Sequence, residues 1–390
     1  MKKLLKSVQY ILGVSMVVSL FACAENDLSI DEAKFDTVVN DKAVKLFTIV
    51  NENGMSVSIT NFGARIVQIL VADKDGYFQD VVLGYDNIKQ YADTATYGGS
   101  DFGAAIGRYA NRINKGRIVV EGKEIQLPVN NYGHCLHGGP QGWQYAVYDG
   151  EQVNDSVVKM TLVSPGGDSN FPGEVTASVV YTLKADNTID IDYTATTTAT
   201  TVINMTNHSY FNLNGDPSRN IENCELYINA DYMTPVDSTF MTTGEIVSVK
   251  DTPFDFRTPK TIGKDINADN QQLKFGMGYD HNWCLNTYSG SADVEKEEIA
   301  VSLWSPITGI RLDVYTNEPG VQVYTGNFLD GSVTGKYGKV YDKRAAICLE
   351  TQKYPDTPNK PNWPTALLKA GETYHSHCAY KFSVAEKLTK

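Results

Sequence analysis

Residues 204–213 read NMTNHSYFNL and follow a long strand-prone stretch. If the strand continues, its side chains alternate between two faces. One face would carry uncharged polar groups and an imidazole, which is typical of the wall of a polar cleft rather than of a solubilised surface. An imidazole can donate and accept protons near neutral pH, so one histidine here is a candidate acid or base. The alternative is a core histidine bonded to a neighbouring strand. The residues of this face are Asn204, Thr206, His208 and Tyr210.

A carboxylate at the end of an apolar run is a second candidate. Residues 345–349 read AAICL, which predicts a buried strand, and Glu350 follows directly. Functional side chains are commonly displayed where strands end. A carboxyl group partly enclosed there has its pKa raised towards the range of a useful base. Glu350 is therefore a candidate general base.

The run HCLHGGP over residues 134–140 predicts a loop that faces a ligand. Gly138 and Gly139 allow a close approach that other residues resist, and they would hold His137 against a bound molecule. His134 and His137 could also bind a metal ion, but the sequence offers no third ligand clustered with them. Metal binding is therefore the weaker interpretation.

Arg112 lies in the run NRINKG over residues 111–116, just before a predicted hairpin turn, and Arg108 is four residues earlier. A guanidinium presents a planar fork of donors that suits sugar hydroxyls or carboxylates. The alternative is that Arg112 forms a surface ion pair.

The run GMGYDHNW over residues 276–283 predicts a loop that leads into a strand. It combines a carboxylate, Asp280, with an amide, Asn282, and two aromatic residues, Tyr279 and Trp283. Aromatic faces pack on sugar rings, while carboxylates and amides bond to sugar hydroxyls. The run therefore predicts part of a sugar site, with an aspartate that merely caps a turn as the alternative.

Short β-prone runs must position these side chains. From about residue 46 onward, runs of this kind are separated by Gly, Asn and Asp turn signals. Residues 73–76 and 114–116 predict hairpin turns. No segment longer than about a dozen residues sustains helical periodicity. Many strands without intervening helices predict one large all-β domain over residues 43–390, folded as an antiparallel sandwich or barrel.

The first 22 residues predict an export signal. A basic start precedes an apolar stretch too short to span a membrane, and LFAC over residues 20–23 is close to a bacterial lipobox. We expect residues 1–22 to be removed and Cys23 to be lipidated. A simple signal peptide or an uncleaved anchor is the alternative. Acidic residues with few apolar ones predict a flexible tether over residues 23–42. The expected location is the bacterial envelope, either periplasmic or at the cell surface.

The formal net charge of −12 becomes −15 once residues 1–22 and their three lysines are removed. No cluster of lysine and arginine remains that could follow phosphates, so nucleic acid is excluded as a partner. The lipid is the only membrane contact that the sequence predicts. Five further cysteines lie scattered without a Cys-x-x-Cys pair, which argues against a disulfide framework or a structural zinc site. They are Cys135, Cys224, Cys284, Cys348 and Cys378.

Together, these motifs resemble the aldose 1-epimerase (galactose mutarotase) family from about residue 45 to the C-terminus. The resemblance implies a large antiparallel β-sandwich, sometimes called a supersandwich, and an enzyme that needs no cofactor and no metal. The substrate would be a free hexose such as galactose or glucose, whose α and β anomers the enzyme interconverts. Many members of the family carry no secretion signal, so this chain differs from them at its N-terminus. This difference leaves the physiological sugar open. The matching runs are NFGA (61–64), VLGYD (82–86), ANRI (110–113), LHGG (136–139), NHSYFNL (207–213), GYDH (278–281), GVQVYTG (320–326) and LETQ (349–352).

The same resemblance implies a role for each site residue. Glu350 would take the proton of the C1 hydroxyl, and His208, starting as an imidazolium, would protonate the ring oxygen. His137 would polarise or orient that oxygen. The other hydroxyl groups would be bound by Arg112, Asp280, Asn111 and Gln322.

Three other functions remain open from the sequence. A glycosidase would use Asp280 and Glu350 as a carboxylate pair, but this leaves both histidines without a role. A noncatalytic sugar-binding lipoprotein would bind the sugar without accelerating anomer exchange. A hexose-6-phosphate epimerase would need more basic residues for its phosphate than Arg108 and Arg112.

Overall fold

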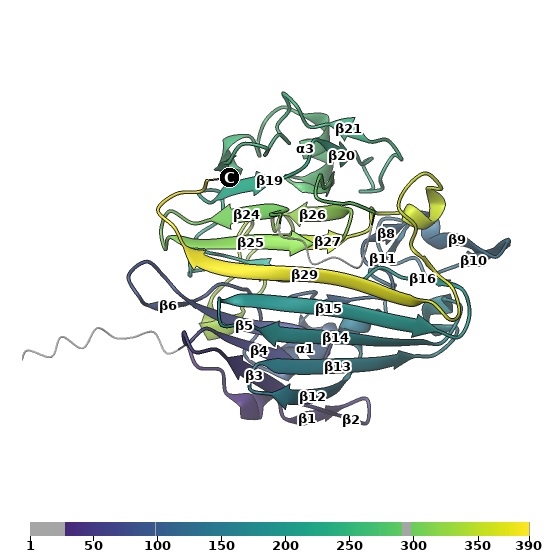
Figure 1. Cartoon of the computed structure of the whole chain (residues 1–390), viewed down its shortest axis with the longest axis horizontal. Coiled ribbons are helices and arrows are strands. Elements are labelled where there is room, and N and C mark those ends of the chain that lie inside the picture. Colours follow the sequence, from purple (N-terminus) through teal and green to yellow (C-terminus); the bar gives the residue numbers. More distant parts are fainter. Residues whose placement is uncertain (1–27, 98, 291–297, 390) are drawn as a thin grey trace, which may run out of the picture.

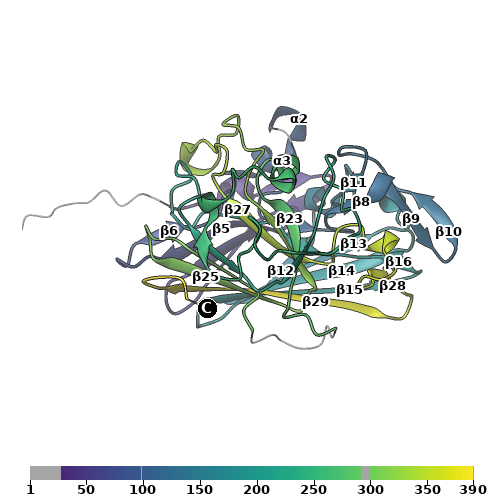
Figure 2. The same cartoon turned by 90° about the horizontal axis from the view of Figure 1, so that it is seen from above.

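Two layers of antiparallel β-sheet form the molecule (Figures 1 and 2). The computed structural model describes residues 28–97, 99–290 and 298–389. In this part of the chain, the α-helices have at most six residues each. The predicted fold class, a large antiparallel β-sandwich, is confirmed.

The first layer is a nine-stranded sheet with the long pair β15 and β29 at its centre. Side chains along β14 alternate between buried and more exposed, as expected for a sheet with one face on the core and the other toward solvent. The strand order is β12 (Asp149–Asn154), β13 (Val157–Ser164), β14 (Val175–Leu183), β15 (Thr188–Thr197), β29 (Thr373–Val384), β25 (Ile310–Thr316), β24 (Val301–Trp304), β19 (Glu225–Ile228) and β22 (Lys260–Thr261).

The second layer combines a six-stranded and a four-stranded sheet. Three adjacent strands of the former, β23, β26 and β27, are buried along their whole length. One face, with Trp283, Val323 and Leu349, joins the main hydrophobic core, and the opposite face carries polar side chains. The six-stranded order is β18 (Tyr210–Phe211), β27 (Ile347–Gln352), β26 (Gly320–Tyr324), β23 (Asp280–Cys284), β20 (Tyr232–Thr234) and β21 (Val247–Ser248). The four-stranded order is β3 (Leu46–Val50), β4 (Ser56–Thr60), β5 (Arg65–Ala72) and β6 (Phe78–Asp80).

Short strand pairs and helical turns complete the described chain. The pairs are β1 (Thr37–Val39) with β2 (Lys42–Val44), β7 (Ala105–Ile106) with β17 (Thr206–Asn207), β8 (Arg112–Ile113) with β11 (Cys135–Leu136), β9 (Arg117–Val120) with β10 (Lys123–Gln126), and β16 (Thr201–Val202) with β28 (Leu367–Leu368). The α-helices are α1 (Ile88–Ala92), α2 (Thr94–Tyr97) and α3 (Gln271–Gly276). The 3₁₀ turns are Glu32–Phe35, Asn114–Gly116, Trp143–Tyr145, Asp168–Asn170, Ile262–Lys264, Lys336–Gly338 and Thr357–Asn359.

The strand predicted to run on through residues 204–210 is broken. After β15 ends, the chain pairs in turn with three different partners, as β16 with β28, β17 with β7 and β18 with β27. Each of these pairs is two residues long, and the chain bends between them. Strand propensity does not report such a change of partner, because the partners are distant in the sequence.

One of the two predicted hairpin turns is confirmed. Residues 73–76 connect β5 and β6, which pair with each other. Residues 114–116 form a 3₁₀ turn instead, and the strands on either side of it, β8 and β9, pair with β11 and β10. That prediction was wrong because turn residues specify a reversal of the chain but not which strands pair across it.

The predicted tether over residues 23–42 is wrong for the part that the structure describes. Residues 28–42 contain a 3₁₀ turn and most of the β1–β2 hairpin. The Phe35 side chain is fully buried, and its ring centroid lies 6.4 Å from that of Tyr91. The buried Phe35 in this acidic stretch therefore helps to attach the segment to the domain.

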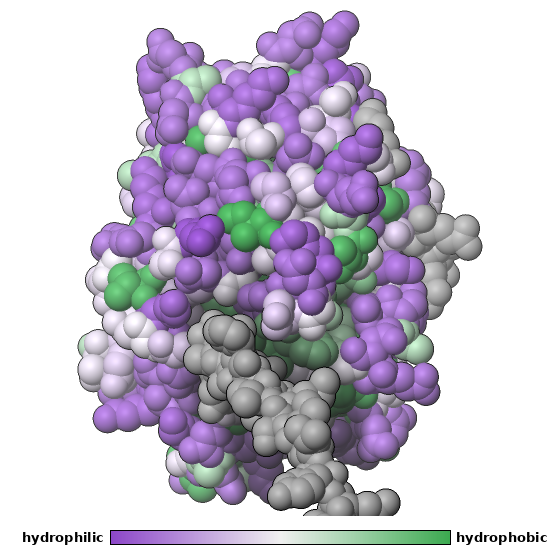
Figure 3. All heavy atoms as spheres, turned by 90° about the vertical axis from the view of Figure 1, so that its left-hand side faces the viewer, coloured by the Kyte–Doolittle hydropathy of each residue, from purple (hydrophilic) through white to green (hydrophobic). Residues whose placement is uncertain are grey.

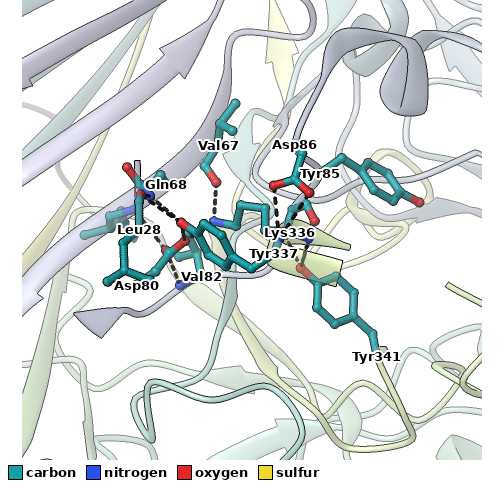
Figure 4. A network of polar contacts seen from close by, with 12 residues as sticks. Leu28, Val67, Gln68, Asp80, Val82, Tyr85, Asp86, Lys336, Tyr337 and Tyr341 are labelled. Atoms are coloured by element: carbon teal, nitrogen blue, oxygen red, sulfur yellow. Dashed lines mark hydrogen bonds and ion pairs between the residues drawn. The ribbon is translucent and has the colours of Figure 1, made fainter. Parts of the chain in front are cut away.

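A buried polar network holds the start of the described chain (Figure 4). The Leu28 carbonyl accepts a hydrogen bond of 2.7 Å from Gln68 Nε2 and lies 3.2 Å from the Tyr337 hydroxyl. The same hydroxyl lies 2.9 Å from Asp80 Oδ2, which pairs with Lys336 Nζ at 2.5 Å. The ion pair is almost fully buried, so removing one partner would leave an uncompensated charge.

Residues 1–22 and Cys23, on which the export and lipidation predictions rest, lie outside the described residues. None of the described helices has the length and apolar character needed to cross a membrane. The visible described surface in Figure 3 is mostly hydrophilic, with small separate apolar spots. The five remaining cysteines are buried free thiols, which agrees with the prediction that no disulfide framework is present.

Candidate active site

A pocket of about 240 Å³ brings together all seven side chains predicted from the sequence to transfer protons or bind the sugar. This volume is below the roughly 300–1,000 Å³ usual for drug-sized ligands, so the pocket suits a small molecule. Its lining comes from β8, β11, β18, β23, β26, β27 and the loops around them. The lining residues are Asp101, Asn111, Arg112, Asn131, Tyr132, Leu136, His137, His208, Tyr210, Asp280, Gln322, Tyr324, Phe328 and Glu350.

His208 and Glu350 meet in this pocket, with His208 Nε2 3.5 Å from Glu350 Oε1. Glu350 belongs to β27, and His208 lies in the bend between β17 and β18. The bend is fixed because the His208 N–H donates to the Ala104 carbonyl at 2.8 Å and its carbonyl accepts from the Gly103 N–H at 3.0 Å. Glu350 Oε2 and His208 Nδ1 have no hydrogen-bond partner within the described protein. The backbone therefore fixes where His208 meets Glu350, while each side chain keeps one polar atom without a hydrogen-bond partner in the described protein.

His137 lies beside His208, with ring centroids 5.3 Å apart. It follows β11 with a positive φ of 51°. The ring Nδ1 of His137 accepts a hydrogen bond of 3.1 Å from the backbone N–H of Asn111. The backbone N–H of His137 in turn donates to the Asn111 carbonyl at 3.2 Å. Because Nδ1 is an acceptor, the neutral ring carries its proton on Nε2. Asn111 thus sets the tautomer of His137 through its backbone.

The Arg112 guanidinium is held by uncharged partners. Its Nε and Nη2 donate to Asn131 Oδ1 at 3.1 and 2.9 Å. The group also lies 5.0 Å from the centre of the Phe240 ring, a favourable position for a cation. Arg112 is buried and pairs with no carboxylate in the described chain, so the surface ion-pair alternative is wrong. Its charge remains available to a ligand.

Three polar side chains form a row across β23, β26 and β27. Gln322 Nε2 donates to Asp280 Oδ1 at 2.7 Å, and Gln322 lies opposite Glu350 in the strand register. Gln322 Oε1 is buried without a partner in the described protein. A buried amide oxygen of this kind is costly unless a donor reaches it, so the row is suited to bind hydroxyl groups.

Burial shifts both carboxyl groups of this row toward the neutral form. It raises the pKa of Glu350 well above its usual value, and the charges of Asp280 and Asp101 raise it further, while Arg112 lowers it. Burial also raises the pKa of Asp280, against the effects of Arg112 and the Gln322 hydrogen bond. A carboxyl group with a raised pKa binds a proton more readily and is a stronger base for catalysis near neutral pH.

Burial has the opposite effect on the histidines. It lowers the pKa of His208, which Asp101 counteracts and Arg65 reinforces. It lowers the pKa of His137 to about 3, so that ring is neutral at ordinary pH. Burial thus raises the pKa of Glu350 and lowers that of His208, so the two groups in contact titrate as a coupled pair.

Asp101, His137 and His208 each present one atom of a kind that binds metals, all within 4.8 Å of one another. A metal would need a free lone pair on His137. The Nδ1 lone pair already accepts the Asn111 N–H, and Nε2 carries the proton of the neutral ring. These residues therefore form an acid–base cluster rather than a metal centre.

Several other residues named from the sequence lie away from the pocket. His134 Nδ1 accepts from the Lys115 N–H at 3.0 Å, and Asn204 Nδ2 donates to the Ala110 carbonyl at 3.1 Å. Thr206 is buried outside the lining as well. These side chains support the loops and strands around the site, so the predicted continuous polar face is reduced to His208 and Tyr210.

The aromatic contacts predicted from residues 276–283 are wrong. Tyr279 and Trp283 are fully buried in the main core, and Trp283 lies three positions after Asp280, on the opposite face of β23. The aromatic residues at the pocket come from other segments, and Tyr132 and Phe328 are 56% and 43% exposed. Five further lining residues, Asp101, Asn131, Tyr132, Tyr324 and Phe328, are not predicted as site residues from the sequence.

A larger groove of about 800 Å³ lies elsewhere on the molecule. It is lined by parts of the N-terminal hairpin, the 140s loop and the end of β13. None of the proton-transfer or sugar-binding candidates lines it, so its size gives no reason to place the chemistry there.

The chain is similar to known proteins over most of its length. A family model described as aldose 1-epimerase matches residues 45–381. Galactose mutarotase from Rattus norvegicus is 40% identical over 343 residues, covering 88% of this chain and 95% of the relative. Aldose 1-epimerase from Escherichia coli (strain K12) is 37% identical over 340 residues, covering 87% of this chain and 95% of the relative.

Solved structures agree with this similarity. An aldose epimerase homologue from C. elegans superimposes with a TM-score of 0.79 at 30% identity, covering 88% of this chain and all (100%) of the other. Galactose 1-epimerase from Lactobacillus acidophilus gives a TM-score of 0.77 at 28% identity, covering 90% of this chain and 97% of the other. With the match to the family model, these similarities show that the chain belongs to the aldose 1-epimerase family.

Proposed function

We propose that this chain is an aldose 1-epimerase that interconverts the α and β anomers of free hexoses such as galactose and glucose. The observation that carries this proposal is the 3.5 Å contact between His208 Nε2 and Glu350 Oε1 in a pocket lined by hydroxyl-binding side chains. The names of the relatives, galactose mutarotase and aldose 1-epimerase, support the same reaction.

The reaction needs one proton to leave the sugar and one to arrive. The C1 hydroxyl loses its proton, the ring oxygen gains one, and the bond between C1 and the ring oxygen breaks. The resulting aldehyde rotates about the C1–C2 bond, and ring closure on the other face reverses both transfers. A base and an acid that share one proton are sufficient for both directions.

We assign the base to Glu350 and the acid to His208, and the 3.5 Å contact between them supports this assignment. In the reactive form, Glu350 is ionised and takes the C1 proton, while His208 is an imidazolium and protonates the ring oxygen. Burial of each group alone favours the neutral forms, with the proton on Glu350 and none added to His208. Moving that proton from the carboxyl group to the imidazole leaves the net charge of the pair unchanged. A C1 hydroxyl that donates to the carboxylate and a ring oxygen that accepts from the imidazolium both favour the reactive form.

The other lining residues orient the sugar. His137 donates a hydrogen bond from Nε2 and polarises or holds the ring oxygen. Arg112, Asp280 and Gln322 bind the remaining hydroxyls, because their donors and acceptors lie around the same small pocket. Asn111 adds to this mainly by fixing His137, since its backbone exchanges two hydrogen bonds with that residue.

A sugar phosphate is disfavoured as the substrate. The Arg108 guanidinium donates to the carbonyls of Pro172 and Gly173 at 2.9 and 2.7 Å and to Ser164 Oγ at 2.6 Å, away from the pocket. Among the described residues, Arg112 is then the one arginine or lysine that lines the pocket. A phosphate dianion is usually met by more than one such group.

Polarimetry with a freshly dissolved single anomer tests the proposal. The protein should speed the approach to anomeric equilibrium of α-galactose or α-glucose without cleaving any glycosidic bond. Binding of the sugar without this acceleration would favour a noncatalytic binding protein and contradict the proposal. Release of p-nitrophenol from aryl glycosides would favour a glycosidase instead.

We also propose that the chain is an exported lipoprotein of the bacterial envelope. The support is the basic and apolar start followed by LFAC over residues 20–23. Cys23→Ala should abolish lipid attachment, because the thioether needs that sulfur, and should release the protein from the detergent fraction. Identical fractionation and identical fatty-acid labelling of the two forms would contradict the proposal.

A further inference from the structure

Asp101 lies beside both histidines of the site and is not explained by the mechanism above. It lines the same pocket, and its carboxylate, His137 and His208 present atoms within 4.8 Å of one another. We propose that Asp101 is a positioning residue for the acid of the reaction, whose negative charge keeps His208 protonated until the ring oxygen takes the proton. This inference rests on the proposed function of His208 and deepens it.

The backbone fixes Asp101 relative to His208. The Asp101 carbonyl accepts from the Ala104 N–H at 3.0 Å, and the next residues, Gly103 and Ala104, exchange hydrogen bonds with the His208 backbone. Gly103 has a φ of 68°, and a Cβ there would lie 1.8 Å from the Ile66 carbonyl oxygen. The turn is therefore closely packed, and it holds the backbone of Asp101 at a set position relative to His208.

One oxygen of the Asp101 carboxylate lacks a hydrogen-bond partner among the described residues. This atom, Oδ1, is buried. The Arg65 guanidinium is nearby, but its Nη1 and Nη2 donate to the carbonyls of Phe102 and Gln144 at 3.0 and 2.6 Å. A buried, unpaired carboxylate oxygen is costly, and an imidazolium on His208 is the charge that would compensate it.

The surrounding charges give the sign of the effect. Asp101 raises the pKa of His208 and of His137, and it raises the pKa of Glu350 as well. Arg65 lowers the pKa of His208. Other ionisable groups that face the pair include Arg112, Asp280, His137, Tyr210, Tyr324 and Cys348. Removing the charge of Asp101 should therefore shift both limbs of the pH–activity profile to lower pH.

Asp101→Asn tests this, because the amide keeps the shape of the side chain and removes the charge. In the sugar-free protein, NMR titration of the His208 ring should show its midpoint at lower pH than in the wild type. The exposed His375 serves as an internal reference that should not change. The kcat profile should shift in the same direction, with a several-fold loss of activity on the alkaline limb. Asp101→Glu should restore much of the wild-type profile.

Asp186→Asn is the matched control. It also removes one negative charge, but from an exposed ion pair with Lys381, and it should leave both the His208 titration and the kcat profile unchanged. An Asp101→Asn variant with a wild-type thermal melt and an unshifted His208 titration would overturn the inference. A raised KM with an unshifted profile would also overturn it, because Asp101 would then be a ligand for a sugar hydroxyl.

The NMR readout does not require turnover, so it separates the two proposals. If the wild type failed to accelerate mutarotation, the proposed function would fall. The His208 titration would still show whether Asp101 controls the protonation of that ring.

Discussion

Gln322 Nε2 donates to Asp280 Oδ1 at 2.7 Å, while Gln322 Oε1 is left without a partner in the described protein. The amide is thus fixed at one end and free at the other. On the adjacent strand, Glu350 lies opposite Gln322 in register. The Asp280 carboxylate, which orients the Gln322 amide, also raises the pKa of Glu350. The amide proposed to bind a sugar hydroxyl and the carboxyl group proposed as the base are therefore both influenced by Asp280.

Asp280→Asn should weaken sugar binding and alter the pH profile together. A hydrogen bond to a charged group contributes about 1.5–3 kcal/mol, so kcat/KM should fall roughly 10- to 100-fold, mostly through KM. The acidic limb should move to lower pH, because the charge that raises the pKa of Glu350 is lost. Initial rates from polarimetry over a pH series measure both effects. An unchanged KM would show that Asp280 does not bind a hydroxyl.

Glu350→Gln should leave the fold intact and lower kcat by roughly 10²–10⁴-fold, since it removes a base but keeps the shape of the side chain. Sugar binding measured by calorimetry should change little by comparison. A variant that melts like the wild type and retains more than about a tenth of its kcat would exclude Glu350 from the mechanism.

Phe35→Ala should destabilise the whole domain by about 3–5 kcal/mol, because it removes a large, fully buried side chain. Val38→Ala in the same segment is the control, since Val38 is 66% exposed. Urea unfolding should show a lower midpoint for Phe35→Ala with an unchanged slope. Equal midpoints for both variants would mean that this segment behaves as a tether after all.

Lys336→Met should cost about 3–5 kcal/mol of folding free energy, because Asp80 would be left as a buried charge without its partner. Adding Asp80→Leu should recover part of that loss, since both charges are then absent. Chemical unfolding of the single and double variants measures the difference. A single variant as stable as the wild type would show that the network in Figure 4 contributes little.

Patterns local in the sequence predicted the fold class and pointed to seven residues that the structure brings together in one pocket. Short strands that alternate with turn signals predict antiparallel sheets, even though they do not say which strands pair with each other. Motifs such as LHGG and LETQ contain their reactive side chain within a run of four residues. The structure adds the pairing of distant segments. The broken strand after β15 and the buried Phe35 both depend on partners far away in the chain.

The missed residues of the site have the same explanation. Asp101 reaches the histidines because Gly103 and Ala104 bond to the His208 backbone, more than a hundred positions later in the chain. Tyr132 and Phe328 lie in loops whose sequences carry no catalytic motif. Conversely, the nearness of Trp283 to Asp280 in the sequence predicts a contact with the sugar, but strand alternation turns Trp283 into the core.

The pH dependence follows from the proposed roles of His208 and Glu350, which together require one proton on the pair. Below the acidic limb the pair takes up a second proton, and Glu350 can no longer act as a base. Above the basic limb the pair loses its only proton, and no acid remains. Activity should therefore follow a bell whose limbs belong to the pair rather than to either residue.

The pH profile of kcat for His208→Asn, compared with the wild type, tests the central claim most directly. Asparagine keeps a polar side chain but has no proton to transfer as an acid. The wild type should show the bell. The variant should bind sugar comparably, lose roughly 10²–10⁴-fold in kcat, and lack the basic limb in its residual activity. If the variant instead binds sugar weakly but keeps both its kcat and the bell, His208 is only a hydroxyl ligand, and His137 becomes the candidate acid.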